Sequence, residues 1–185
     1  MLKNLNKNKF KYLYPNMTKG FTLAEVIVAI FILTVGIIGV SALITSTISS
    51  AIHSSNKLVA AYLAQEGIEI IRNIRDTNWI QQSTNWDEGL TICSAGCEAD
   101  YNISTAEDPT LTSYGSGRFL YIDGTNRFYR YIDIPGPSDA VTKFKRKMTI
   151  TSIDVDTLNV SAFVSWEEKG IPYTVTAKEY LYDWY

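Results

Sequence analysis

One stretch near the start of the chain decides how the rest is interpreted. It joins a lysine-rich segment to an apolar run and reads Lys19-Gly20-Phe21-Thr22-Leu23-Ala24-Glu25-Val26-Ile27-Val28-Ala29-Ile30-Phe31-Ile32-Leu33. The 19 residues from Val26 to Ile44 carry no charge. A helix of that length is about 28 Å long, close to the thickness of the hydrocarbon core of a bilayer. The sequence therefore predicts a helix that can cross a membrane.

Charge is unevenly distributed along the 185 residues. The first 20 residues hold five lysines and no acid, whereas the other 165 carry 12 basic and 19 acidic side chains, a net charge of −7. Because lysines flanking a membrane helix stay in the cytoplasm, we expect a cytoplasmic N-terminus and export of everything after Ile44. The acidic body repels phosphate, which argues against nucleic acid as a partner. The overall composition, 46% hydrophobic and 19% charged, is ordinary and excludes a disordered or collagen-like chain.

Three ways of processing this segment compete. A secretory signal peptide would have a shorter apolar run, although Val40-Ser41-Ala42 supplies small residues for a cleavage site after Ala42. An uncleaved membrane anchor is the second possibility. The third is a cut between Gly20 and Phe21, before the apolar run begins.

Glu25 is an acid beside an apolar segment, where a carboxylate needs a partner or a place at the interface. Thr22 and Glu25 have the spacing of a capping box, with Phe21 and Val26 as a hydrophobic staple. A cut before Phe21 would also create an α-amine about 6 Å from Glu25 along the helix axis. Glu25 would then neutralise this amine, in its own chain or in a neighbouring copy, and an unpaired charge in a low-dielectric packing would be penalised. The capping role and the pairing role are compatible.

The stretch Lys19-Gly20-Phe21-Thr22-Leu23-Ala24-Glu25-Val26, in this context, resembles the processing motif of type IV pilins and type II secretion pseudopilins. The resemblance implies cleavage between Gly20 and Phe21 by prepilin peptidase, N-methylation of Phe21, and a role for Glu25 in assembly and register. It implies three kinds of partner besides membrane lipid: the peptidase, other pilin subunits and an inner-membrane assembly platform. No cofactor is expected. The precursor would cross the cytoplasmic membrane once, and the mature subunit would lie in a cell-surface or periplasmic filament.

The apolar positions after Ile44 recur at helical spacing, which predicts that the helix continues from about Thr22 to about Asp76. A break near Ser54-Ser55-Asn56 is the alternative. The stripe expected to pack on a sheet comprises Ile48, Ile52, Val59, Leu63, Ile70 and Ile74. The predicted organisation is a leader that is removed (1–20), a membrane or filament-core helix (21–44), its exported amphipathic continuation (45–78) and a loop-rich antiparallel β domain (79–185).

The region after Pro109 favours strands, whereas residues 79–109 are polar and predicted to be a loop. Residues 118–123 and 127–132 predict a hairpin, and a second hairpin turns at Glu168-Lys169-Gly170. The predicted strands of the rest of the domain are 147–155, 159–166 and 173–180. The expected fold class is α+β, a long helix packed on an antiparallel sheet of four or five strands, as in pilins.

The two cysteines, Cys93 and Cys97, lie in this exported region and are expected to form a disulfide. They and the single, distant His53 cannot supply a tetrahedral metal site, and we expect His53 on the exposed side of the helix. The acids of Asp154-Val155-Asp156 and Asp87-Glu88 are more typical of solvated turns than of calcium sites.

The C-terminal strands make the resemblance more specific. The strand containing Val164-Ser165-Trp166, a glycine turn and a closing strand that ends at Tyr180-Leu181 resemble minor pilins of the PilV kind and I-type pseudopilins. A non-enzymatic structural subunit is therefore the leading hypothesis. Its alternatives are a binding module on an uncleaved membrane tether and a secreted enzyme released after Ala42, for which we identify no persuasive catalytic cluster.

Overall fold

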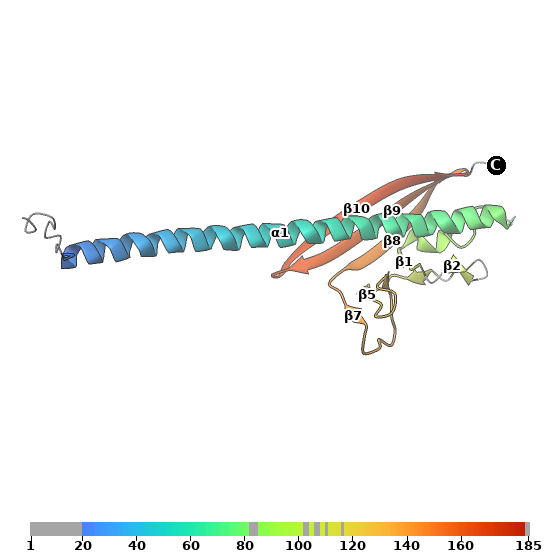
Figure 1. Cartoon of the computed structure of the whole chain (residues 1–185). Coiled ribbons are helices and arrows are strands. Elements are labelled where there is room, and N and C mark those ends of the chain that lie inside the picture. Colours follow the sequence, from blue (N-terminus) through green and yellow to red (C-terminus); the bar gives the residue numbers. More distant parts are fainter. Residues whose placement is uncertain are drawn as a thin grey trace, which may run out of the picture. The chain divides into compact units, whose positions relative to one another are not determined.

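A computed structural model of the chain describes residues 20–81, 85–101, 104–105, 108–109, 111–115 and 117–183 (Figure 1). The chain divides into two compact units, residues 1–49 and residues 50–185. One helix, α1 (Leu23–Ile80), begins in the first unit and continues into the second. The predicted long helix is therefore confirmed, and the alternative break is excluded because Ser54-Ser55-Asn56 is helical. Residues 1–19 of the predicted leader lie outside the described residues.

The second unit contains the main sheet, whose five strands in the described part of the chain have the order β10-β9-β8-β1-β4. The strands are β8 (Lys145–Asp154), β9 (Thr157–Glu168), β10 (Ile171–Tyr182), β1 (Cys97–Glu98) and β4 (Thr112–Ser113). All neighbours are antiparallel, and β9 pairs with β10 along its whole length. Within this unit the three long strands accompany the second part of α1 (Figure 1). The predicted α+β class, a long helix on an antiparallel sheet, is confirmed.

The turn between β9 and β10 lies where the sequence predicted it. Its two central residues, Lys169 and Gly170, have φ angles of 52° and 80°. Two-residue hairpin turns with positive φ at both positions match the twist of the flanking strands, and glycine adopts such angles without strain. The turn sets the register in which Glu168 faces Ile171.

The short strands differ from the prediction. The expected hairpin of residues 118–123 and 127–132 pairs only over two residues on each side, and it belongs to a separate sheet. That sheet has the order β6-β5-β7, formed by β6 (Tyr129–Arg130), β5 (Tyr121–Ile122) and β7 (Ala140–Val141). A further pair joins β2 (Ser104–Thr105) to β3 (Asp108–Pro109).

The place beside β8 is taken instead by β1, in a segment that the sequence analysis had assigned to a loop. A 3₁₀ helix, η1 (Thr91–Ser94), precedes it. A disulfide joins Cys93 to Cys97, and both cysteines are fully buried. This closed loop places Cys97 in the main sheet, where it pairs with Met148 of β8. The loop prediction was wrong here because a two-residue strand has too few residues to produce an alternating pattern.

The hydrophobic core lies between α1 and the inner face of the main sheet. The predicted stripe is confirmed for Leu63, Ile70 and Ile74, which are at most 7% exposed, but Ile48 and Ile52 are more than half exposed. The core cluster also includes Ala60, Ala64, Ile71, Met148, Ile150, Val160, Val164 and Leu181. Burial on α1 thus begins at Ala60.

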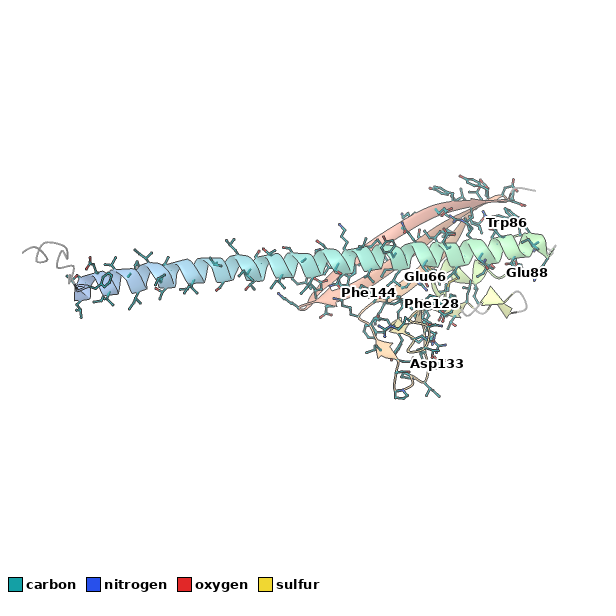
Figure 2. The ribbon with its side chains drawn as sticks, in the orientation of Figure 1. Glu66, Trp86, Glu88, Phe128, Asp133 and Phe144 are labelled. Atoms are coloured by element: carbon teal, nitrogen blue, oxygen red, sulfur yellow. A yellow bond between two sulfur atoms is a disulfide. The ribbon has the colours of Figure 1, made fainter. Side chains whose placement is uncertain are left out.

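A fully buried arginine occupies the middle of this core. Arg146 on β8 donates hydrogen bonds to the carbonyls of Leu63 (3.0 Å) and Ala99 (2.6 Å). Glu66, labelled in Figure 2, lies 3.5 Å from its guanidinium. Burial raises the pKa of Glu66, although the charge of Arg146 opposes this shift. A buried guanidinium is tolerated only with such acceptors, so Arg146 ties helix, β1 segment and sheet together.

The helix ends at Ile80, four residues later than the predicted Asp76. The Asn78 side chain donates hydrogen bonds to the carbonyls of Trp86 and Glu88, both at 3.0 Å (Figure 2). The Arg75 guanidinium lies 4.5 Å from the centre of the Trp79 ring. Contacts with the segment after the helix therefore extend its last turn beyond the end that the sequence pattern predicted.

The other end of the sheet is held to the helix by Glu168. Asn56 donates a hydrogen bond to its carboxylate (2.5 Å), as does the Trp166 indole (2.8 Å), and His53 Nδ1 lies 3.3 Å away. The His53 ring also packs on Tyr173, with centroids 4.6 Å apart. His53 therefore faces the sheet, and the expectation that it lies on the exposed side of the helix was wrong. Its partner Glu168 is 115 residues away, so a local sequence pattern could not predict the contact.

Close packing between α1 and β8 leads to a first prediction. A Cβ added to Gly67 would lie 2.7 Å from Met148 Sδ and 3.0 Å from Arg146 Cδ. We expect Gly67→Val to lower the free energy of unfolding of this unit by about 1–3 kcal/mol, as overpacking usually does. Denaturant unfolding of the detergent-solubilised chain measures this loss. Gln65→Val, at an exposed position of the same helix, controls for the helix propensity of valine, and equal losses in both variants would contradict the packing argument.

The Glu168 contacts lead to a second prediction, on pH. Burial opposes ionisation of Glu168, but hydrogen bonds from Trp166, Asn56 and His53 and the charge of Lys143 outweigh it and lower the pKa below its ordinary 4.5. A depressed acid pKa stabilises the fold above the unfolded pKa, and the contribution is lost as pH falls through the folded pKa. The Trp166 indole N–H resonance should therefore titrate with a midpoint below 4.5. The titration should vanish in Glu168→Gln, and a midpoint above 4.5 would contradict the assignment.

Candidate processing and assembly site

The candidate site begins just before the first helical residue. Gly20 is exposed, no atom lies within 4 Å of the place where its Cβ would be, and Phe21 is 85% exposed. Helix α1 starts two residues later, at Leu23. The Gly20–Phe21 peptide bond is thus in an open, non-helical segment directly before a helix.

Thr22 and Glu25 form the predicted capping box. The Thr22 hydroxyl accepts a hydrogen bond from the Glu25 amide at 3.3 Å. The Glu25 carboxylate in turn accepts from the Thr22 amide at 3.1 Å and from the Thr22 hydroxyl at 3.2 Å. These bonds satisfy amides that have no partner inside the helix, and the carboxylate lies at the positive end of the helix dipole. The capping prediction is confirmed.

The predicted staple contributes little in the single chain. Phe21 is 85% and Val26 is 45% exposed. The reciprocal hydrogen bonds, and not an apolar contact, define the helix start. Phe21 therefore remains available for another surface.

The apolar residues that follow the cap are unburied. Among the large hydrophobic side chains from Val26 to Ile44, exposure ranges from 45% at Val26 to 70% at Leu43. Helix α1 is long and apolar enough to cross a membrane, judged by length and composition alone. Among the described residues, this part of the helix therefore presents an exposed apolar surface.

Hydroxyl groups on this helix are satisfied locally. Thr34 donates to the Phe31 carbonyl (2.8 Å), Thr45 to that of Ser41 (3.0 Å) and Thr47 to that of Leu43 (2.9 Å). Such bonds to a preceding carbonyl make a hydroxyl compatible with an apolar environment. These three hydroxyls therefore do not require water.

Sequence reasoning missed two exposed apolar residues on the part of α1 in the second unit. Leu58 is 56% and Tyr62 is 62% exposed. They are four residues apart, so they share one helix face, different from the face that carries Leu63. Their four-residue spacing was the available signal, but both lie outside the stripe predicted to pack on the sheet.

The remaining candidate residues do not converge on a catalytic or metal centre within the described part of the chain. No group of three or more His, Cys, Asp or Glu side chains there could hold a metal ion. Asp154, one of the acids considered for calcium, instead accepts a hydrogen bond from the Asp156 amide at 3.0 Å. This is the arrangement of a solvated turn.

Comparison with known proteins places the site within a recognised motif. Residues 15–41 match the family model of the prokaryotic N-terminal methylation motif. Searches of curated proteins and of solved structures gave no match. The matched residues include the open Gly20–Phe21 bond, the capping box and most of the exposed apolar segment. The N-terminal part of this chain therefore carries a methylation motif, which indicates a type IV pilin-like or pseudopilin-like precursor.

Proposed function

We propose that this chain is a structural subunit, a minor pilin or pseudopilin, of a type IV pilus or a type II secretion filament. Prepilin peptidase cuts it between Gly20 and Phe21 and methylates the new amine of Phe21. The domain limits are those of the sequence analysis: leader 1–20, apolar helix 21–44, helical continuation 45–78 and β domain 79–185. The subunit performs no chemistry of its own.

One observation carries this proposal: the charge-free segment Val26 to Ile44 is helical and exposed, whereas the second unit has its own core. An apolar surface of this extent is not stable in water, and two environments cover it. Lipid does so in the precursor, and the helices of neighbouring subunits do so in a filament. Assembly thus exchanges one apolar environment for another after the lysine-rich leader is removed.

The capping box explains how the Glu25 carboxylate can be accommodated both in the lipid-embedded precursor and in the filament. In the single chain Glu25 is already held at the helix start by its bonds to Thr22. Cleavage then places a positive amine on Phe21, about one helical turn away. In the filament the carboxylate of one subunit pairs with this amine in another, where a low dielectric strengthens the attraction and penalises misplaced copies.

Additional contacts between subunits come from the exported part of the helix. The Leu58 and Tyr62 side chains form an apolar face continuous in chain order with the core segment. The minor-subunit assignment is supported by the layout of β9 and β10, in which the strand with Val164-Ser165-Trp166 is followed by the closing strand. The inner-membrane assembly platform is the partner that extracts the processed helix.

A membrane-tethered binding module is the alternative. It uses the same apolar helix as an uncleaved anchor, and it differs in leaving the Gly20–Phe21 bond intact. The N-terminus of the mature chain therefore distinguishes the two functions directly.

The processing role predicts the effect of changing Gly20. In cells with the cognate peptidase, we expect mass spectrometry to find wild-type chain beginning at N-methylated Phe21, and Gly20→Val chain retaining its leader because the added side chain blocks the cleavage site. Gly36→Val is the matched control, since a Cβ there also meets nothing within 4 Å. Normal maturation of Gly20→Val would argue strongly against this function.

The assembly role predicts a pattern among three variants. Glu25→Gln retains a side chain able to complete the capping box but loses the charge, Glu25→Ala loses both, and Thr22→Ala loses the cap alone. All three should be cut. Removing one partner of a buried ion pair costs about 3–5 kcal/mol, so incorporation of both Glu25 variants into filaments should fall by about 100-fold or more. Thr22→Ala should lose tenfold or less, as a cap contributes about 1 kcal/mol.

Immunoblots of sheared filaments, normalised to mature subunit in the membrane, measure incorporation. Wild-type incorporation of Glu25→Gln would remove the charge-pairing role and leave only the cap.

A further inference from the structure

The β9–β10 turn is tethered to residues of α1 that follow the apolar segment by about nine to twelve positions in the chain. Glu168, just before the turn, is bonded to His53 and Asn56 of α1. His53 follows Ile44 by nine residues, which rise about 14 Å in a helix. Head groups add roughly 5–8 Å to each side of a bilayer core. When residues 26–44 span a membrane, the helical rise from Ile44 to His53 therefore exceeds the head-group layer by no more than about a Debye length.

The surface around this turn combines lysines with exposed apolar groups. We call it the turn surface and define it as Lys57, Phe119, Lys143, Lys145, Lys169, Ile171 and Pro172. Phe119 is 44% and Ile171 is 54% exposed. Lys145 Nζ lies 4.6 Å from the centre of the Phe119 ring, so the ammonium and the ring form a cation–π contact.

A hollow on the turn surface has the size and chemistry for a head group. Its volume is about 260 Å³, and it is lined by two lysines, one acid and four other residues: Lys143, Lys145, Glu167, Phe119, Ser165, Trp166 and Pro172. Two ammonium groups beside an aromatic ring suit a phosphate whose neighbouring atoms are apolar. The turn surface thus offers both a charge and an apolar contact to a lipid.

The charge of the turn surface is opposite to that of the unit that carries it. Residues 50–185 contain 12 basic and 18 acidic side chains. The turn surface contributes four of these lysines, among which lie Glu167 and Glu168; Lys143 Nζ is 3.8 Å from the Glu168 carboxylate. Glu168 is already bonded to Asn56, Trp166 and His53. An anionic membrane therefore attracts this end of the unit and repels the rest.

We propose that the turn surface docks on anionic phospholipid head groups on the exported side of the membrane that holds the helix. This inference rests on the proposed membrane-inserted precursor. The tether supplies a high effective concentration of lipid, so a weak surface is sufficient. Docking keeps the β domain against the bilayer, with a fixed end toward the lipid, until the helix is extracted.

The test uses the full chain reconstituted in phosphatidylcholine vesicles with or without phosphatidylglycerol. Cys93 and Cys97 are joined in a disulfide, so a fluorophore can be placed on Ile171→Cys. Val155→Cys provides the control label, because Val155 is 85% exposed and precedes the opposite end of β9. Quenching by lipids with a nitroxide on the head group reports contact with the membrane surface.

We expect strong quenching at position 171 in vesicles that contain phosphatidylglycerol, and little at position 155. Lys145→Gln and Lys169→Gln should each lower the ratio of docked to undocked protein by about fivefold. Lys178→Gln, an exposed charge on β10 outside the turn surface, should leave the ratio unchanged.

Three results would overturn the inference, and they differ in what else they affect. Equal quenching at positions 171 and 155 in a chain that floats with the vesicles would refute docking and leave the proposed function intact. Equal effects of Lys178→Gln and Lys145→Gln would refute the assignment to the turn surface. A chain that fails to float with vesicles would refute both the docking and the membrane-inserted precursor.

Discussion

The structure is organised by a constraint on one segment: residues 26–44 form an apolar helix whose large side chains are exposed among the residues that the structure describes. Hydroxyl groups on and beside it donate to their own helix, and its only nearby acid, Glu25, is held at the helix start by Thr22. Each of these hydrogen bonds satisfies a polar group that would otherwise need water. Lipid and other helices are the environments suited to such a surface.

The second unit contains its own hydrophobic core. Its part of α1 buries Leu63, Ile71 and Ile74 against the sheet, and the fully buried Arg146 bonds to carbonyls of both the helix and the β1 segment. Moving the helix or the β1 segment away from Arg146 would leave this buried charge with fewer acceptors, which is costly. Its folded state can thus persist while the apolar segment passes from one environment to another.

The two ends of the apolar segment then have distinct physical roles. At its start, a carboxylate already oriented by hydrogen bonds lies one turn from the amine that cleavage would create. Further along the chain, Glu168 fixes the β9–β10 turn to His53 and Asn56 of the same helix. Charge thus specifies position at both ends, whereas apolar area supplies most of the free energy.

The sequence by itself determined the features whose signals are local. The length of the charge-free run predicted the exposed helix, the three-residue spacing of Thr22 and Glu25 predicted the cap, and a glycine turn predicted the long hairpin. Only the tertiary structure decided that β1 enters the main sheet, that the hairpin after Arg118 leaves it, that Arg146 is buried and that His53 faces Glu168. These features depend on distant contacts. Arg146 bonds to Ala99, which is 47 positions away, and His53 contacts Glu168, which is 115 positions away. Periodicity and turn chemistry act over a few residues, so they specify elements, while the choice of distant partners is made by the packing of a shared core.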